Sequence, residues 1–175
     1  MTNLVILVSE RDHIQGVTTA PITVVQYGDY QSPKCAIGHQ IIQSIQQQLD
    51  EQLCFVFRHF PRTELHPYAQ HAAEAADAAS IQGKFWEMHD CLFNCQSAFD
   101  NGTLVECADA LSLDISQFLR ELAADVHTSR IQEDVDSGIR SGVQETPTFF
   151  INGWRYDGAC EHSRLLAAIA KSAAT

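Results

Sequence analysis

At 175 residues the chain is long enough for one globular domain with a proper core, and its 45% hydrophobic and 19% charged content is ordinary for such a domain. The formal net charge of −11 is unevenly distributed, because residues 64–137 hold 14 acidic and 3 basic residues. Acidic surfaces repel polyanions, so we expect neither nucleic acid nor an anionic membrane as a partner.

The longest apolar run, Leu4–Val8, is too short to span a membrane and lacks the basic flank and cleavage site of a signal peptide. We therefore expect a cytoplasmic protein. Because a reducing compartment keeps cysteines as thiols, all six are predicted to be free: Cys35, Cys54, Cys91, Cys95, Cys107 and Cys160.

Cys91 and Cys95 lie four residues apart on a predicted helix, too far apart for an unstrained disulfide. With His89 they suggest a metal site only weakly, because positions 89 and 91 point to different helix faces. We favour ordinary helix packing and no metal.

The first strand expected is Leu4–Val8, followed by a loop over residues 9–20. Residues 22–27 then form a β-branched and aromatic run, which predicts a buried strand. Ser32 is a favourable N-cap and Pro33 a favourable first helical residue, so a helix should begin there.

Residues 53–58 alternate well enough to be the next strand, so strand, helix and strand make a parallel, right-handed βαβ unit. Residues 64–142 carry helical patterns and no strand signal. Pro67 should open an alanine-rich helix, and the other start and stop signals are Thr103 with Glu106, Asp114 with Gln117, Ser129 with Gln132, and Gly142.

Two short strand patterns, 149–151 and 154–156, flank Asn152-Gly153, which is the strongest short hairpin signal. Residues 162–172 should form the last helix.

Several separate motifs, in order along nearly the whole chain, resemble those of cytosolic-type DsbA-like thioredoxin-fold oxidoreductases. They are Ser9-Glu10-Arg11-Asp12-His13-Ile14, Tyr27-Gly28-Asp29-Tyr30-Gln31-Ser32-Pro33-Lys34-Cys35, Phe55-Val56-Phe57-Arg58-His59-Phe60-Pro61, Gly83-Lys84-Phe85-Trp86-Glu87-Met88-His89 and the segment 142–153 with its Thr146-Pro147 pair. The resemblance implies an α/β thioredoxin-like domain over 1–63 and 143–175, with a helical insertion over 64–142.

The active-site segment departs from this family at two positions. The family has Cys-Pro-x-Cys, so Ser32 stands where the nucleophilic cysteine is expected, and Gln26 stands where many thioredoxin-like proteins carry a buried proton-shuttling acid. A serine hydroxyl cannot form a disulfide. Two changes in one mechanism favour a natural altered site over a single replacement introduced to trap an intermediate.

The resemblance also implies roles for the remaining site residues. Cys35 lies at a helix N-terminus beside Lys34, which favours a thiolate, yet the family's second cysteine is usually shielded, so an inert thiol is at least as well supported. The Thr146–Pro147 bond is expected to be cis, with its loop facing Ser32 and able to pair with an extended peptide or glutathione.

We expect the histidines and tryptophans to have ordinary structural roles. His39 could pair with Cys35, but a surface position is favoured. His59, His66 and His71, with Trp86 and Trp154, are assigned to packing and turns.

Three functional hypotheses follow. The first is a DsbA-like thiol-disulfide oxidoreductase by descent, acting on protein thiols or disulfides, with its dithiol exchange impaired or lost at Ser32-Pro33-Lys34-Cys35. The second is a glutathione-dependent enzyme that uses Ser32, as the kappa-class glutathione transferases do. The third is a non-catalytic module that binds peptides. The first two differ in cofactor: none, or glutathione.

Overall fold

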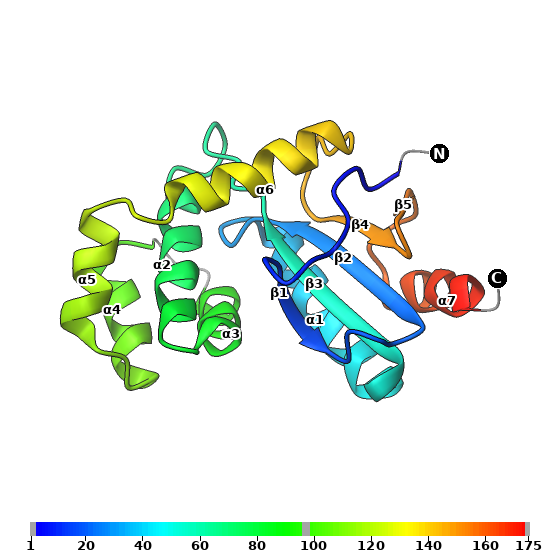
Figure 1. Ribbon diagram of the computed structural model, residues 1–175, viewed down its shortest axis with the longest axis horizontal. Helices are drawn as coiled ribbons and strands as arrows, with labels where there is room; N and C mark the ends of the chain where they lie inside the picture. The colour runs from blue at the N-terminus through cyan, green and yellow to red at the C-terminus, as the bar shows by residue number, and fades with distance from the viewer. Residues whose placement is uncertain (1–2, 96–98, 174–175) are drawn as a thin grey trace.

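The computed structural model describes residues 3–95 and 99–173. Its centre is a five-stranded sheet in the order β1-β3-β2-β4-β5 (Figure 1). The pair β2 and β3 is parallel, and the other neighbouring pairs are antiparallel. The strands are β1 (His13–Gly16), β2 (Ile22–Gly28), β3 (Leu53–His59), β4 (Thr148–Ile151) and β5 (Trp154–Tyr156).

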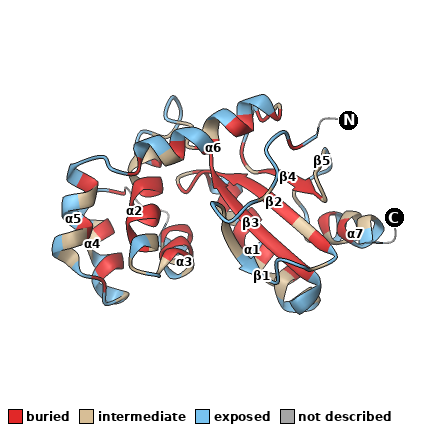
Figure 2. Ribbon diagram, in the orientation of Figure 1, coloured by how far each residue is buried: buried red, intermediate tan, exposed pale blue. Residues whose placement is uncertain are grey.

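The predicted βαβ unit is confirmed. Strand β2 leads into α1 (Pro33–Leu49), and a 3₁₀ turn, η1 (Asp50–Gln52), connects that helix to β3. All of β3 and nearly all of β2 are buried, as expected for the central strands of a sheet covered on both faces (Figure 2).

The two faces of the sheet carry separate apolar layers because side chains alternate along a strand. Val24 faces the layer that includes residues of α1 and of α7 (His162–Ala173). Its neighbour Val25 faces the other layer, which is closed by the N-terminal segment and by α6. The sheet therefore lies between two covering layers.

In the described part of the connection from β3 to β4 there are five helices. Four of them, α2 to α5, lie together beside the sheet, while α6 crosses toward β4 (Figure 1). They are α2 (Ala69–Ile81), α3 (Phe85–Cys95), α4 (Asn101–Ala110), α5 (Ile115–Ala123) and α6 (Thr128–Arg140). Small residues on α2 are fully buried and permit close packing. The limits of the insertion at 63/64 and 142/143 stay predictions.

Helix starts were predicted less well than helix existence. Asp114 caps α5 as predicted, accepting a hydrogen bond from Gln117 N, and Gly142 follows the end of α6 with φ +75°. Three starts were wrong. Helix α2 begins two residues after Pro67, Asp100 rather than Thr103 caps α4, and α6 begins after His127 with no side-chain cap where Ser129 was expected.

The N-terminal strand was also mispredicted. Leu4–Val8 is not a strand, because its polar backbone groups bond to side chains and to the hairpin. Arg58 Nη1 and Nη2 donate to the carbonyls of Ile6 and Leu7, and Ser141 Oγ accepts from Val5 N–H. The edge strand is instead β1, inside the segment expected to be a loop.

The C-terminal predictions are confirmed. Strands β4 and β5 form a hairpin whose two turn residues, Asn152 and Gly153, have φ of 49° and 84°, as this tight turn requires. Helix α7 follows and buries Leu165 and Ile169. Among the described residues, no helix has the length and apolar character to cross a membrane.

Candidate functional site

Ser32 lies where β2 and its following turn meet α1, and it caps that helix as predicted. Its Oγ accepts a hydrogen bond from the backbone N–H of Cys35 across 3.4 Å, and Pro33 occupies the first turn of the helix. The serine is only 4% exposed. Its hydroxyl therefore already supports the helix terminus, as an N-cap does.

Asp29 holds the turn in front of this helix, and sequence reasoning did not single it out. One carboxylate oxygen accepts from Gln31 N–H at 2.8 Å. The other accepts from Arg62 N–H at 2.9 Å and lies 2.7 Å from His66 Nδ1. An acid immediately after a buried strand and its glycine was the available signal. Asp29 fixes the turn to the segment that follows β3.

Cys35 is fully buried, and its sulfur accepts a hydrogen bond from Asp29 N–H across 3.5 Å. Burial raises the pKa of the Cys35 thiol to about 11, although the Asp29 backbone and the side chains of Ser32 and Thr146 act to lower it. The free-energy cost of desolvating the thiolate outweighs the stabilisation of the thiolate by the helix terminus and by nearby Lys34, which is exposed to solvent. The thiol is protonated at neutral pH, which favours the inert interpretation of Cys35.

The Thr146–Pro147 peptide bond is cis, as predicted, and its loop lies against α1 beside Cys35 and Gly38. That the loop faces Ser32 stays a prediction. Thr146 is buried, and its side chain forms a hydrogen bond with the Cys35 thiol that acts to lower the pKa of the thiol. A methyl group built on Gly38 of α1 would lie 3.3 Å from Pro147 Cγ, so a residue without a side chain lets the loop approach the helix closely.

A groove of about 320 Å³ runs between the start of α1 and the cis-proline loop. Ile37 and Pro147 provide apolar walls, and Lys34 and Glu145 provide opposite charges. Cys160, which precedes α7, also lines it. Ser32 and Cys35 do not line this groove, so the structure brings the predicted residues together but leaves the two Cys-Pro-x-Cys positions beneath its surface.

Gln26 lies at the centre of the sheet, between Phe57 of β3 and Phe149 of β4. It is 1% exposed, and its Nε2 has no hydrogen-bond partner among the described residues. An amide neither gains nor loses a proton near neutral pH, so this side chain cannot act as a proton shuttle.

Two histidines meet one buried carboxylate between the sheet and the inserted helices, a contact that sequence reasoning missed. His59 is buried, in agreement with its assignment to packing, and His13 is partly buried. His13 Nε2 and His59 Nε2 lie 2.7 and 3.0 Å from the same oxygen of Asp77 on α2. Burial alone would raise the pKa of Asp77, but His59 and His13 hold it well below its usual range. Desolvation lowers the pKa of His13 to about 4, against the opposing effect of Asp77.

His39 is likewise buried, which corrects its assignment to the surface. Its ring stacks on Phe93, and Nε2 lies 3.3 Å from Asp90 Oδ1 without hydrogen-bond geometry. Burial lowers the pKa of His39 to about 4. His89 turns inward and contacts Tyr30 across 3.0 Å. Sequence reasoning missed the burial of His39 and His89 because the helical pattern of one segment does not indicate which other helices pack against it.

The six cysteines are not all thiols. Cys91 of α3 and Cys107 of α4 form a disulfide, and Cys35, Cys54, Cys95 and Cys160 are free. The prediction that all six are free, which rested on an expected reducing compartment, is therefore wrong. The spacing argument compared Cys91 only with Cys95 on the same helix, whereas its bonded partner comes from the next helix.

Comparison with known proteins agrees with this architecture. A family model described as "Thioredoxin" matches residues 8–171. The chain belongs to the thioredoxin family. Among solved structures, this thioredoxin-family chain is similar to a thioredoxin-like oxidoreductase from Silicibacter pomeroyi DSS-3, with 25% identity, TM-score 0.84 and 95% of both chains covered. Oxidised BdbD from Bacillus subtilis has the same TM-score and coverage at 22% identity, which supports the fold alone. The predicted thioredoxin-like fold with its DsbA-like helical insertion is thus confirmed.

The curated relatives of this thioredoxin-family chain are much longer proteins. The chain is 43% identical over 160 residues to "Na(+)/H(+) antiporter NhaA 1" of Salinispora arenicola. The aligned region covers 91% of this chain and 24% of that protein. The chain spans about a quarter of the length of these relatives, and their names describe the whole antiporters.

Proposed function

We propose that this chain is a DsbA-like thioredoxin-family protein that has lost dithiol exchange at Ser32-Pro33-Lys34-Cys35 and binds extended polypeptide segments in the groove beside Pro147. The main support for the loss of dithiol exchange is the environment of the Cys35 thiol. Its thiol is buried, and its pKa is raised to about 11. Exchange requires a thiolate that can reach a disulfide, and neither this thiol nor the Ser32 hydroxyl supplies one.

The groove itself favours a polypeptide ligand. Ile37 is 56% exposed and faces open space next to Pro147, an apolar surface that a single side chain of a ligand could cover. The backbone N–H and C=O of Thr146 make no hydrogen bond to another described residue. Such groups can pair with an extended chain laid beside them, while Lys34 and Glu145 orient its polar parts.

Glutathione is the second candidate ligand, since the same loop could pair with its backbone. The Ser32 hydroxyl accepts from Cys35 N–H and does not line the groove, so we rank a thiolate-stabilising role for Ser32 below peptide binding. From the sequence alone, we propose that the protein acts in the cytoplasm and that its partners are segments of other proteins. We propose neither nucleic acid nor a membrane as a partner.

Calorimetry with S-carboxymethylated insulin B chain tests the proposal, because this probe is extended and has no free thiol. We expect binding by the wild-type protein and about tenfold weaker binding by Ile37→Asp, which puts a charge on the apolar wall. Ile81→Asp is the matched control, because Ile81 is also an exposed isoleucine, at 62%, but ends α2.

The absence of wild-type binding, or equal loss in both variants, would contradict peptide binding. Tight glutathione binding that depends on Ser32 would favour the alternative. Insulin reduction at the rate of a thioredoxin standard would contradict the loss of dithiol exchange.

A further inference from the structure

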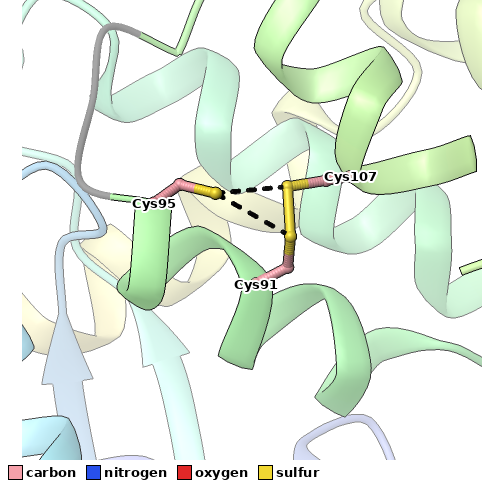
Figure 3. The surroundings of a disulfide bond; sticks show 3 residues. All are labelled: Cys91, Cys95 and Cys107. Carbon is pink, nitrogen blue, oxygen red and sulfur yellow. Dashed lines mark hydrogen bonds between the residues drawn. A yellow bond between two sulfur atoms is a disulfide. The ribbon is translucent and has the colours of Figure 1, made fainter. Parts of the chain in front are cut away.

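Three cysteine sulfurs meet where the end of α3 lies against α4, in a cluster made of Cys91, Cys95 and Cys107 (Figure 3). Cys91 and Cys107 are joined as a disulfide, with their Cα atoms 6.3 Å apart. The free Cys95 sulfur lies 4.0 Å from that of Cys91 and 3.7 Å from that of Cys107. This cluster belongs to the inserted helices, and nothing in the groove beside Pro147 contributes to it.

The position of Cys95 does not suit attack on this disulfide. Displacement at sulfur proceeds with the incoming and leaving sulfurs on opposite sides. With an S–S bond of about 2.05 Å, an in-line Cys95 would be about 5.7 Å from Cys91. The observed separation is 4.0 Å, so Cys95 lies beside the bond. The three sulfurs form a triangle rather than a line.

A triangle of sulfurs is the arrangement that a thiophilic metal ion requires. A tetrahedral ion with metal–sulfur bonds of about 2.3 Å holds its sulfurs about 3.8 Å apart. The two distances from Cys95 are 4.0 and 3.7 Å, so they already match that spacing. Only the bonded pair would have to separate, by less than 2 Å beyond the S–S bond length.

We propose that, once its disulfide is reduced, this cluster binds one thiophilic divalent cation of the zinc class through Cys91, Cys95 and Cys107. Three thiolates leave the fourth position of a tetrahedral ion for water or an added ligand. The spacing Cys91-x-x-x-Cys95 lies within the range found in structural zinc sites, and the third ligand comes from the neighbouring helix.

Burial and charge around the cluster are compatible with such an ion. Cys107 is 3% exposed, Cys91 is partly buried and Cys95 is exposed, so an ion could enter from the Cys95 side and be held against the protein interior. The acidic excess of residues 64–137 makes the surrounding field favourable to cations.

Metal binding at this site would depend on the redox state. A dithiol reductant gives two electrons and two protons to the Cys91–Cys107 disulfide, which becomes two thiols while the reductant becomes a disulfide. The cation then displaces one proton from each of the three thiols. In the oxidised state two of the three sulfurs are bonded to each other and are no longer thiolates, so the site cannot form.

Anaerobic titration of the phosphine-reduced protein with Co²⁺ tests this directly. We expect one equivalent to give a sulfur-to-cobalt charge-transfer absorption, which Zn²⁺ then removes by displacing cobalt. Cys95→Ser should weaken binding on the order of 100-fold, the share of one ligand in a structural zinc site. Cys160→Ser, which removes a partly exposed thiol elsewhere, should bind as the wild type does.

The wild-type protein offers a second comparison that needs no variant. Oxidation with diamide should abolish the charge-transfer absorption, and renewed reduction should restore it, with far-UV circular dichroism showing that the helices persist. The absence of this absorption in the reduced protein, an unchanged affinity in Cys95→Ser, or equal binding before and after oxidation would overturn the proposal.

Discussion

The backbone N–H of Asp29 donates a hydrogen bond to the Cys35 sulfur across 3.5 Å, while the Asp29 carboxylate holds the segment after β3 through Arg62 N–H. One residue therefore both fixes the turn before α1 and covers the thiol at its start. Burial raises the pKa of the Cys35 thiol, and the Asp29 backbone N–H, which acts to lower that pKa, does not offset the cost of desolvation. The helix terminus at this position supports structure rather than nucleophilic chemistry.

Cys35 should resist alkylation in the folded protein. With a pKa of about 11, about one Cys35 thiol in 3,000 is ionised near pH 7.5, and burial also keeps the reagent away from the sulfur. We expect iodoacetamide to label Cys95 and Cys160 first, and Cys35 only after unfolding. Peptide mass spectrometry over a time course gives the three rates. Labelling of Cys35 as fast as that of Cys160 would show that the sulfur is accessible and reactive.

The buried histidines predict that the protein loses stability in acid. His13 and His39 have pKa values of about 4 when folded and about 6.5 when unfolded, so the unfolded chain takes up more protons between these values. The free energy of unfolding should be unaffected above about pH 7 and fall as the pH drops from about 6.5 toward 4. We expect a loss of at least about 2 kcal/mol, measured by urea denaturation at several pH values.

A single variant tests the assignment. His39→Leu removes one buried titrating group and should flatten the pH dependence between about pH 6.5 and 4. An identical pH profile in the wild type and His39→Leu would mean that this histidine does not contribute.

Short sequence motifs correctly predicted the features that depend on interactions between neighbouring residues. Ser32 and Pro33 start α1, and Asn152-Gly153 turns the hairpin, because capping and turn preferences depend on adjacent residues. The cis-proline loop and the Ser32-to-Cys35 segment were also placed side by side correctly, through the resemblance rather than through periodicity.

Errors arose where distant residues decide the structure. Leu4–Val8 has a strand-like composition, but Arg58 on β3 binds its carbonyls. The pairing of Cys91 with Cys107 depends on how α3 meets α4, and the contact of His13 with Asp77 depends on where the insertion packs against the sheet. No pattern within one segment contains these contacts.

Asp77 should be essential for joining the inserted helices to the sheet. It bridges His13 on β1 and His59 on β3 from α2, and its own side chain is about 1% exposed. Asp77→Ala would leave the buried His59 and the partly buried His13 without their shared partner, which costs about 3–5 kcal/mol. Chemical denaturation measures this loss. The control is Asp109→Ala on the exposed face of α4, which should change the free energy of unfolding by less than about 0.5 kcal/mol. Similar values for both variants would contradict a central role for Asp77.

Ser32→Cys should place a Cys-Pro-Lys-Cys pair at the start of α1 and restore measurable insulin reduction. The introduced thiol would sit at the helix terminus, which favours its thiolate, and Lys34 adds a nearby cation. The loss of the serine cap costs about 1 kcal/mol. Gln26 limits the gain, because this position has no carboxyl group to take the Cys35 proton, and burial raises the pKa of that thiol to about 11.

Adding Gln26→Glu should therefore increase the activity of Ser32→Cys. A buried carboxyl in this central position would have a raised pKa, suited to proton transfer near neutral pH. Insulin reduction by the wild type, Ser32→Cys, and the double variant gives the order of activity, and Gln26→Glu alone is the control that should remain inactive. Thiol counts before and after mild oxidation should fall by two more in the variants carrying Ser32→Cys than in the wild type. If no disulfide to Cys35 forms, the burial of Cys35 prevents exchange even with both thiols present, and the peptide-binding function would gain support.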